Sequence, residues 1–300
     1  MNIFVIGATG FVGGSLARHL NAAGHTVTGL ARTGAAAEIL AAQGIIPVAG
    51  DLEDRRPMVV DAARRADGVI YAAQPAPAIE TATTDELIRA LAGTGKTLVF
   101  LSGSGVLMQR TAGAWSPDVF AEHDPFTPEP LAEYRKAAED SVLAAAGVRS
   151  MVIRPGLIWG PGDHGHVSMI YRPVAATGAA SYIGSGLNTY SHVHIDDVTR
   201  LIDRALTHGR AGGLYHAAAG ETPNRWIAEQ VAADLGVETR SLTTEEATEV
   251  WGEFGALIMA ASSRIRAVAA RRELGWHPEH TDMLTEIGEH RLRQLAYTTV

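Results

Sequence analysis

The stretch MNIFVIGATGFVGG, residues 1–14, decides the fold. Its first part, Asn2–Ile6, predicts a buried strand, and Gly10–Ala23 predicts a helix. In the turn between them, Gly7 permits a sharp reversal, Gly10 lets a phosphate approach the backbone, and Gly13 lets the helix pack close to the strand. The helix start directs free N–H groups and the positive end of its dipole at that phosphate. The stretch therefore predicts that the pyrophosphate of a nicotinamide dinucleotide binds here.

Strand and helix patterns alternate through the first half of the chain. Further strands are expected at Thr26–Ala31, Ile45–Val48, Gly68–Ala72, Thr97–Leu101 and Ser150–Arg154. Helices are expected between them, including Ala35–Gln43, Asp85–Ala92 and Pro130–Ala146. Such alternation implies parallel strands joined by right-handed crossovers, and continuous apolar strands imply helices on both faces. The predicted fold class is α/β, a Rossmann doubly wound parallel sheet.

After Pro155 the alternation of strand and helix patterns becomes irregular. Residues 156–190 are rich in Gly, Pro, His and Tyr, and Val193–Leu206 resembles a strand end that leads into a helix. The remainder predicts helices at Pro223–Leu235, Thr244–Gly252, Ser263–Leu274 and Asp282–Leu295. We expect a dinucleotide-binding domain over 1–155, with 188–216 returning to it. A small, mostly helical substrate-binding region would then comprise 156–187 and 217–300.

The composition narrows the class of protein. Of the 300 residues, 46% are hydrophobic and 19% are charged, as in a globular domain with a sizeable core. The chain has no cysteine, which excludes disulfides and thiolate sites and agrees with a cytoplasmic location. The net charge of −8 argues against nucleic-acid binding. Neither a long apolar span nor a secretion-signal pattern is present, so no membrane association is expected.

The end of the second strand bears on the choice of cofactor. An acidic residue there would bind the ribose 2′-hydroxyl of NAD, whereas an arginine accommodates the 2′-phosphate of NADP. The chain has Arg32 at this place and no Asp or Glu beside it, so we expect NADP(H) to be preferred over NAD(H). Asp51 and Leu52 follow the third strand, where Asp51 either contacts the adenine or serves as an ordinary loop aspartate.

Several stretches, taken in order, resemble one superfamily. They are GATGFVGG (7–14), GDL (50–52), VIYAA (69–73), VFLSGSGVL (99–107), VIRPGLIWGPGDHG (152–165), HVHIDDVTRLIDRAL (192–206) and RRELGWHP (271–278). With these the chain resembles the extended short-chain dehydrogenase/reductase superfamily, and more closely its NAD(P)-dependent epimerase/dehydratase-like members. The resemblance implies a Rossmann domain with a small C-terminal substrate region, and dimers are common in the superfamily.

The resemblance also implies which residues meet the cofactor. Ala72 and Ala73 would line the channel on the nicotinamide side, and Pro155, Gly156 and Leu157 would lie beside the nicotinamide. The remaining expected contacts are Thr9, Phe11, Val12, Ser102 and Arg135, together with the glycines, Arg32, Asp51 and Leu52 named above.

The usual catalytic motif of the superfamily, Tyr-x-x-x-Lys, is missing. Aligning Glu139 with the acid that normally follows the lysine puts Arg135 at the lysine position and Leu131 at the tyrosine position. Arg135 is able to bind the ribose, but its pKa is too high for proton donation. Tyr134 lies next to Arg135, about 100° around the helix, and is either the displaced proton donor or a half-buried helix aromatic.

Other candidates must supply the substrate contacts. The usual catalytic hydroxyl falls on Gly103, so Ser104 is the nearest substitute and Ser102 the next. His164, in a loop expected to border the substrate pocket, is a candidate proton donor because histidine titrates near neutrality. Further pocket candidates are His166, Tyr171, Tyr182 and Tyr190.

We expect no metal, because the two His-x-His pairs, His164 with His166 and His192 with His194, have no acidic or cysteine partner at a ligand spacing. His194, Asp196 and Asp197 are expected to stabilise a loop and to cap the following helix.

Three functions fit the sequence. The first is an NADP(H)-dependent oxidoreductase for a small carbonyl or alcohol, with Ser104 polarising the oxygen and Tyr134 or a loop histidine handling the proton. The second is a sugar-nucleotide epimerase or dehydratase, against which stands the single basic residue, Arg172, between 156 and 190. The third is a non-catalytic dinucleotide-sensing module. The partner is a small molecule in the first two cases, and a homodimer is compatible with all three.

Overall fold

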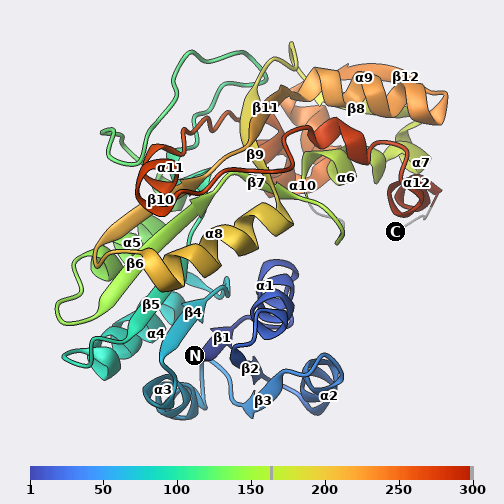
Figure 1. Cartoon of the computed structure of the whole chain (residues 1–300). Helices are drawn as coiled ribbons and strands as arrows, with labels where there is room; N and C mark the ends of the chain where they lie inside the picture. The colour runs from blue at the N-terminus through green and yellow to red at the C-terminus, as the bar shows by residue number, and fades with distance from the viewer. Residues whose placement is uncertain (163–164, 298–300) are drawn as a thin grey trace.

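The computed structural model describes residues 1–162 and 165–297 (Figure 1). Seven parallel strands form the main sheet in the order β10-β6-β5-β4-β1-β2-β3. They are β1 (Asn2–Ile6), β2 (Thr26–Ala31), β3 (Ile46–Ala49), β4 (Gly68–Tyr71), β5 (Thr97–Leu101), β6 (Arg149–Pro155) and β10 (Gly213–Ala217). The order reverses between β1 and β4, which is where an open sheet of this kind binds ligands. The predicted doubly wound Rossmann sheet is confirmed.

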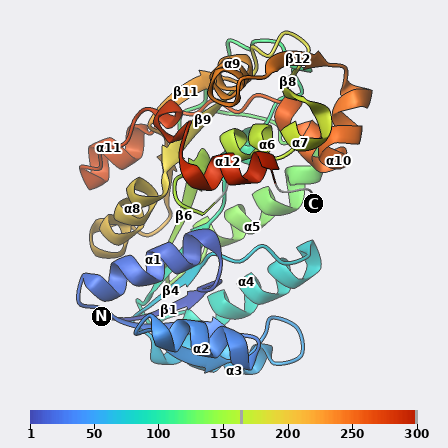
Figure 2. The same ribbon diagram turned by 90° about the vertical axis from the view of Figure 1, so that its right-hand side faces the viewer.

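Helices cover both faces of this sheet (Figure 2). One face carries α1 (Phe11–Ala22), α2 (Gly34–Ala42), α8 (Ile195–His208) and α11 (Val268–Leu274). The other face carries α3 (Arg56–Arg65), α4 (Pro77–Leu91) and α5 (Glu133–Leu143). Two separate buried apolar clusters result, one on each face. Because both faces are covered, the inner strands β1, β4 and β5 are almost entirely apolar and buried, as the sequence predicts.

A second region lies above the sheet in Figure 1. It contains a three-stranded sheet in the order β11-β9-β7 and a two-stranded parallel sheet of β12 and β8. The strands are β7 (Leu157–Trp159), β8 (Ala179–Ile183), β9 (Thr189–His194), β11 (Gly220–Pro223) and β12 (Glu238–Leu242). The α-helices are α6 (His166–Tyr171), α7 (Val174–Thr177), α9 (Asn224–Leu235), α10 (Thr244–Ala260) and α12 (His290–Tyr297). Short 3-10 turns are η1 (Ser104–Leu107), η2 (Pro130–Ala132) and η3 (Met283–Glu286).

The helical predictions for the last third are partly wrong. Only Val268–Leu274 of the expected helix Ser263–Leu274 is helical, because Ser262, Ser263 and Ile265 form β-bridges to distant segments. The expected helix Asp282–Leu295 is divided at Gly288, whose φ of +93° no helix can contain. The expected helix Thr244–Gly252 does form, and Gly252, whose φ of +71° is not helical, separates it by a kink from a second helical stretch that ends at Ala260.

The structure also shows how the two parts of the chain interleave. β9 joins the small sheet, whereas α8 and β10, which follow it, join the main sheet. The division into a cofactor-binding domain over 1–155 with 188–216 and a substrate-binding remainder stays a proposal. In the part of the chain that the structure describes, no helix is long and apolar enough to cross a lipid bilayer.

Candidate active site

A cavity of about 500 Å³ opens where β1, β2 and β4 end. Eight of the expected cofactor residues line it: Gly7, Thr9, Gly10, Arg32, Asp51, Leu52, Ala72 and Ala73. Eight further residues complete the cavity wall and were not identified as site residues from the sequence: Ile6, Leu30, Thr33, Ala36, Glu53, Gln74, Pro75 and Ile79. The cavity thus contains residues that follow four different strands. These residues are distant in sequence and meet because the four strands end at the same edge of the sheet.

The glycine turn fits a dinucleotide pyrophosphate. Gly7 has a φ of +93°, and a Cβ on it would stand 2.6 Å from the carbonyl oxygen of Ala72. A Cβ on Gly13 would stand 2.2 Å from the carbonyl oxygen of Gly7, so only glycine allows α1 to approach β1 this closely. Gly10 is the N-cap of α1 and supplies no side-chain cap, which leaves the amides of the first turn available to an anion.

Replacing Gly13 with alanine should destabilise the protein and weaken dinucleotide binding. The added methyl overlaps backbone, not a movable side chain, so we expect a loss of about 1–3 kcal/mol in the free energy of unfolding. Gly34→Ala is the matched control, because a Cβ there meets nothing within 4 Å. Urea unfolding with a parallel NADPH titration measures both effects, and an unchanged Gly13→Ala protein would contradict the packing argument.

Two arginines and two acids lie at the end of the cavity formed by β2 and β3. Arg32 is exposed at the end of β2, and the guanidinium of Arg55 donates to the carbonyl oxygen of Arg32 at 3.2 Å. The Thr33 hydroxyl accepts from the amide of Ala36 and caps α2, whose N-terminus therefore faces the same place. The acids in the lining are Asp51 and Glu53. The sequence drew attention to Arg32 but not to Arg55, because Arg55 lies in a turn after a different strand.

Asp51 lines the cavity, and its carboxylate accepts hydrogen bonds from neighbouring protein groups. It accepts from the amides of Glu53 and Arg55 at 3.0 and 3.1 Å and from the Arg55 side chain at 2.7 Å. These hydrogen bonds from Arg55 hold the pKa of Asp51 well below its usual range. An adenine contact by Asp51 stays a prediction, while its role in fixing the turn is visible.

The expected nicotinamide side lies at the ends of β5 and β6. Ser102 is buried, and its hydroxyl has no hydrogen-bond partner among the described residues. Pro155 ends β6, and Gly156 passes so close to β9 that a Cβ would stand 2.2 Å from the Ser191 carbonyl oxygen. Leu157 follows on β7 and is half-buried. These residues form one continuous edge beside Ala72 and Ala73 of the neighbouring strand.

The first turn of α1 holds the other two expected contacts. Val12 packs against the core on one face of the sheet. The ring of Phe11 lies against Gly162, where a Cβ would stand 2.4 Å from a ring carbon. The side chains of both residues thus pack against protein, and a contact from either residue to the cofactor stays a prediction.

Arg135, at the lysine position, is held by an acid that sequence reasoning missed. Its guanidinium forms an ion pair with Glu80 of α4 at 2.9 Å and lies over the ring of Phe100. Glu80 is fully buried, and desolvation raises the pKa of its carboxyl, an effect that Arg135 opposes. The structure therefore shows a fixed guanidinium at this position, and a contact from Arg135 to the cofactor ribose stays a prediction.

The helix-start residues do not restore the usual tyrosine. Leu131 lies in η2 and is 39% exposed, and Tyr134 is half-buried one residue into α5. No hydrogen bond joins the Tyr134 hydroxyl to another described residue. A role for Tyr134 in proton transfer stays a prediction.

The serine turn after β5 is tied to the second region. Ser104 opens η1, is buried, and accepts a hydrogen bond from the Ser263 hydroxyl through its backbone carbonyl at 2.6 Å. The contact fixes the turn that carries both Ser102 and Ser104. His164, the expected loop proton donor, lies outside the described residues.

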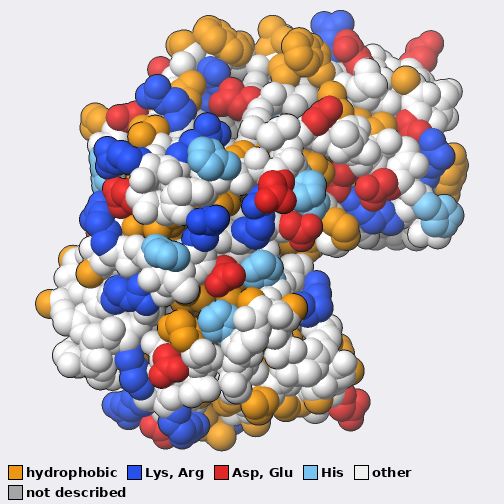
Figure 3. Space-filling model, viewed as in Figure 1, with side chains coloured by type: hydrophobic (Ala, Val, Ile, Leu, Met, Phe, Trp, Pro, Cys, Tyr) orange, Lys and Arg blue, Asp and Glu red, His pale blue; other side chains and the backbone are white. Residues whose placement is uncertain are grey.

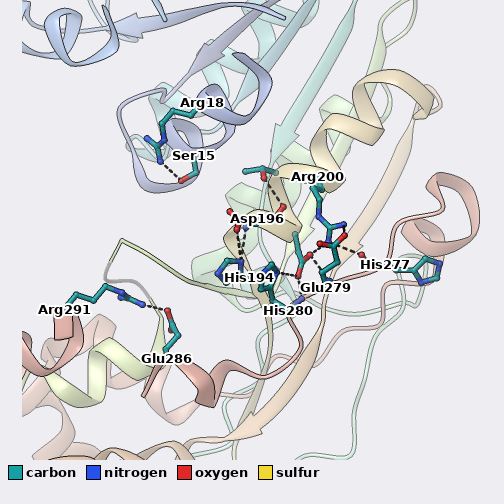
Figure 4. Close-up of polar contacts among 12 residues, drawn as sticks. Ser15, Arg18, His194, Asp196, Arg200, His277, Glu279, His280, Glu286 and Arg291 are labelled. Atoms are coloured by element: carbon teal, nitrogen blue, oxygen red, sulfur yellow. Dashed lines mark hydrogen bonds and ion pairs between the residues drawn. The ribbon is translucent and has the colours of Figure 1, made fainter. Parts of the chain in front are cut away.

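The segment from His194 to Asp197 caps α8, as the sequence predicts, and also binds the backbone of a loop that is distant in sequence. The Nδ1 atom of His194, which stands beside Asp196 in Figure 4, accepts from the amide of Asp196 and so caps α8. Asp197 accepts from the amides of Glu279 and His280. Ligand atoms of His194, Asp196 and His280 come within 4.8 Å of one another. The Nδ1 lone pair of His194 is used by the cap, and the His194 and His280 rings are stacked with their centroids 4.1 Å apart. The expectation that His194 has no acidic partner at a ligand spacing is wrong, because Asp196 and His280 stand beside it in space, and the absence of a metal stays a prediction.

On the side viewed in Figure 3, the surface has no large patch of only positive or only negative side chains. Arginine, lysine and acidic side chains alternate there, and the outline is deeply notched between the main sheet and the second region. Such a mixed surface is typical of a protein that recognises its ligand inside a cleft and not on a charged face.

Comparisons with known proteins agree with this geometry. The family model of the NAD dependent epimerase/dehydratase family matches residues 3–218. An uncharacterized protein of Schizosaccharomyces pombe is 32% identical over 96% of this chain and 98% of its own length. The 2-alkyl-3-oxoalkanoate reductase of Stenotrophomonas maltophilia is 31% identical over 79% of this chain and 76% of its own.

Solved structures extend the likeness to the whole fold. The dTDP-glucose 4,6-dehydratase of Bacillus anthracis in complex with NAD superposes with a TM-score of 0.74 at 20% identity, covering 99% of this chain and 95% of the dehydratase. The turn, the sheet and the matched sequence agree, and the chain therefore belongs to the NAD-dependent epimerase/dehydratase family of the extended short-chain dehydrogenase/reductase superfamily.

Proposed function

We propose that the protein is an NADP(H)-dependent reductase of small carbonyl compounds. The observation that carries the proposal is the cavity at the sheet edge, in which the glycine turn lies at one end and Arg32 with the start of α2 at the other. A dinucleotide with its pyrophosphate on the glycine turn would extend its adenosine half toward Arg32, and the Arg32 guanidinium and the start of α2 suit a 2′-phosphate. Once bound, the cofactor supplies hydride exchange at its nicotinamide ring.

The protein's own residues position and polarise the substrate. The buried Ser102 hydroxyl and the turn at Ser104 lie at the end of β5, where a hydroxyl is able to donate to a substrate carbonyl oxygen. Arg135 adds a fixed positive charge, since Glu80 prevents its guanidinium from swinging away. Such a charge favours the electron-rich oxygen that develops during reduction.

We further propose an oxo compound with an apolar arm as the substrate. One apolar cluster lies beside the expected nicotinamide edge and contains Met108, Leu157, Tyr190, Leu257 and Ile258. The relative from Stenotrophomonas maltophilia is named for acting on 2-alkyl-3-oxoalkanoates, which combine a ketone with alkyl chains. A sugar nucleotide is less well supported, because Arg172 is the single basic residue between 156 and 190 and stands exposed at the end of α6.

Cofactor titration followed by turnover tests the proposal. We expect NADPH to bind at least roughly tenfold more tightly than NADH, a difference of about 1.4 kcal/mol, when nucleotide fluorescence is followed. We expect NADPH oxidation with ethyl 2-methyl-3-oxobutanoate and none with UDP-glucose. Tight NADPH binding without turnover of any ketone in a panel would favour the sensing module, and an NADH preference would remove the assigned role of Arg32.

A further inference from the structure

One face of the small sheet carries an unusual set of side chains. Leu157 of β7 is in register with His192 of β9, and Trp159 is in register with His194. Because alternate residues of a strand share a face, Leu157 and Trp159 lie on the same side as Tyr190, His192 and His194. The opposite side of β9 faces the main core through Val193.

Polar atoms on this face are buried without partners. The Trp159 Nε1, Tyr190 hydroxyl and His192 Nδ1 atoms have no hydrogen-bond partner within the described residues. All three side chains are nine-tenths buried or more. Leaving such an atom unpaired costs about 1–3 kcal/mol, and native proteins seldom tolerate several together. Several on one face therefore indicate a surface built to receive a polar ligand.

Tyr190 is the member of this set that packs beside the expected nicotinamide edge. Its ring packs with Leu157 and Met108, and its backbone bridges to Ser263, whose hydroxyl donates to the Ser104 carbonyl at 2.6 Å. Tyr190 is thus one contact away from both segments that the proposed function places at the nicotinamide, the serine turn after β5 and the segment after β6. The His166 ring meets the Tyr190 ring edge-on, with centroids 5.3 Å apart.

The other tyrosines of this region are already occupied. The Tyr171 hydroxyl donates to Asp234 at 2.7 Å and accepts from the amide of Gly288. Tyr182 packs its ring under the guanidinium of Arg225 and has a half-buried position. Of the three tyrosines that the sequence offered, Tyr190 alone combines a buried hydroxyl with no partner among the described residues.

We propose that Tyr190 is the proton donor that replaces the missing tyrosine of the usual motif. This rests on the proposed reductase function. In the step, the hydride of NADPH bonds to the carbonyl carbon, the carbonyl π electrons move to oxygen, and the oxygen takes the proton of the Tyr190 hydroxyl. The tyrosinate then regains a proton from water. The sum is ketone, NADPH and one proton giving alcohol and NADP⁺.

The electrostatics of the face agree with reduction. Burial raises the pKa of Tyr190, so the residue keeps its proton at neutral pH, and an alkoxide is basic enough to take it. Burial also lowers the pKa of His166 and of His192 to about 4, which leaves both imidazoles neutral. A face of neutral donors and acceptors suits an uncharged carbonyl group and offers nothing to a diphosphate.

Tyr190→Phe tests the proposal, because it removes the hydroxyl and keeps the ring. With NADPH and ethyl 2-methyl-3-oxobutanoate we expect kcat to fall by roughly 10²–10⁴-fold, the usual contribution of a general acid. NADPH affinity and the thermal midpoint should stay near wild type. Affinity of the protein–NADP⁺ complex for the same ketone, measured by calorimetry, should fall by roughly 2–10-fold, as expected for one lost hydrogen bond. Tyr297→Phe, an exposed site, is the matched control.

The outcomes separate the two proposals. An active wild type with a Tyr190→Phe protein within fivefold of it overturns the Tyr190 assignment and leaves the reductase function standing. The assignment also fails if Tyr134→Phe loses activity while Tyr190→Phe retains it. A wild type that binds NADPH yet reduces no ketone overturns both proposals. Loss of kcat in Tyr190→Phe together with weaker ketone binding and intact NADPH binding supports the assignment.

Discussion

Arg154→Ala is expected to remove about 3–5 kcal/mol from the free energy of unfolding, a large share of the total for most domains. Arg154 is on β6 and Glu139 is on α5, and both side chains are almost completely buried. The guanidinium Nε donates to both carboxylate oxygens, at 2.9 and 3.1 Å, and a second nitrogen completes a two-pronged contact. Removing the cation leaves the Glu139 carboxylate buried and unpaired, which is the costly outcome for an ion pair of this kind.

Urea unfolding of wild type, Arg154→Ala and the double variant Glu139→Gln/Arg154→Met measures the effect. The double variant should lose clearly less than Arg154→Ala, because neither side chain is then a stranded charge. Arg64→Ala is the matched control, since Arg64 and Asp61 form an exposed pair within α3 and such pairs contribute about 0–1 kcal/mol. A loss below about 1.5 kcal/mol in Arg154→Ala would show that Glu139 is solvated in solution.

The pair also matters to the site. Glu139 is one helical turn after Arg135, which Glu80 holds from the other side. The two ion pairs fix α5 between α4 and β6, so the segment that begins with Leu131 keeps its place beside the sheet edge. Arg154→Ala is therefore expected to reduce turnover as well as stability, even though Arg154 contacts Glu139, His216 and the Phe126 ring and not the cofactor cavity.

Local pattern was sufficient for the part of the fold that holds the cofactor. The first strand, the glycine turn and the start of α1 are neighbours in sequence, and their geometry follows from Gly7, Gly10 and Gly13 themselves. The parallel order of the sheet followed from the alternation of strands and helices. Arg32 could be placed in the same cavity as the glycine turn because the end of the second strand has a fixed position relative to that turn.

Contacts between segments that are distant in sequence could not be predicted from local pattern. Glu139 served as an alignment landmark, but its partner is separated from it by 15 residues, and nothing local distinguishes Arg154 from an exposed arginine. The same holds for Glu80, which lies outside the expected helix Asp85–Ala92 and which the fold places, completely buried, in the first turn of α4. The partnerless hydroxyl of Tyr190 depends on β7, β9 and α10 together, so only the assembled structure separates it from Tyr171 and Tyr182.

Arg32→Gln is expected to weaken NADPH binding by roughly 10–100-fold and NADH binding by less than about threefold, since a charge-assisted hydrogen bond contributes about 1.5–3 kcal/mol. Arg32 is exposed on the cavity wall, beside the capped start of α2 and the guanidinium of Arg55. A 2′-phosphate would meet all three, whereas the 2′-hydroxyl of NADH has no charge for them to stabilise. The loss should shrink at high salt, because the site is open to solvent.

Fluorescence titration of both nucleotides at low and high salt provides the measurement. Arg18→Gln is the matched control, because Arg18 is an exposed arginine on α1 that hydrogen-bonds Ser15 and does not line the cavity. Arg55→Gln should give a smaller selective loss than Arg32→Gln, since its guanidinium also holds Asp51 and the turn before α3. Equal weakening of NADPH and NADH in Arg32→Gln would mean that the residue supports the shape of the adenosine pocket and does not recognise phosphate. The preference for NADP(H) would then have to come from α2 and Arg55 alone.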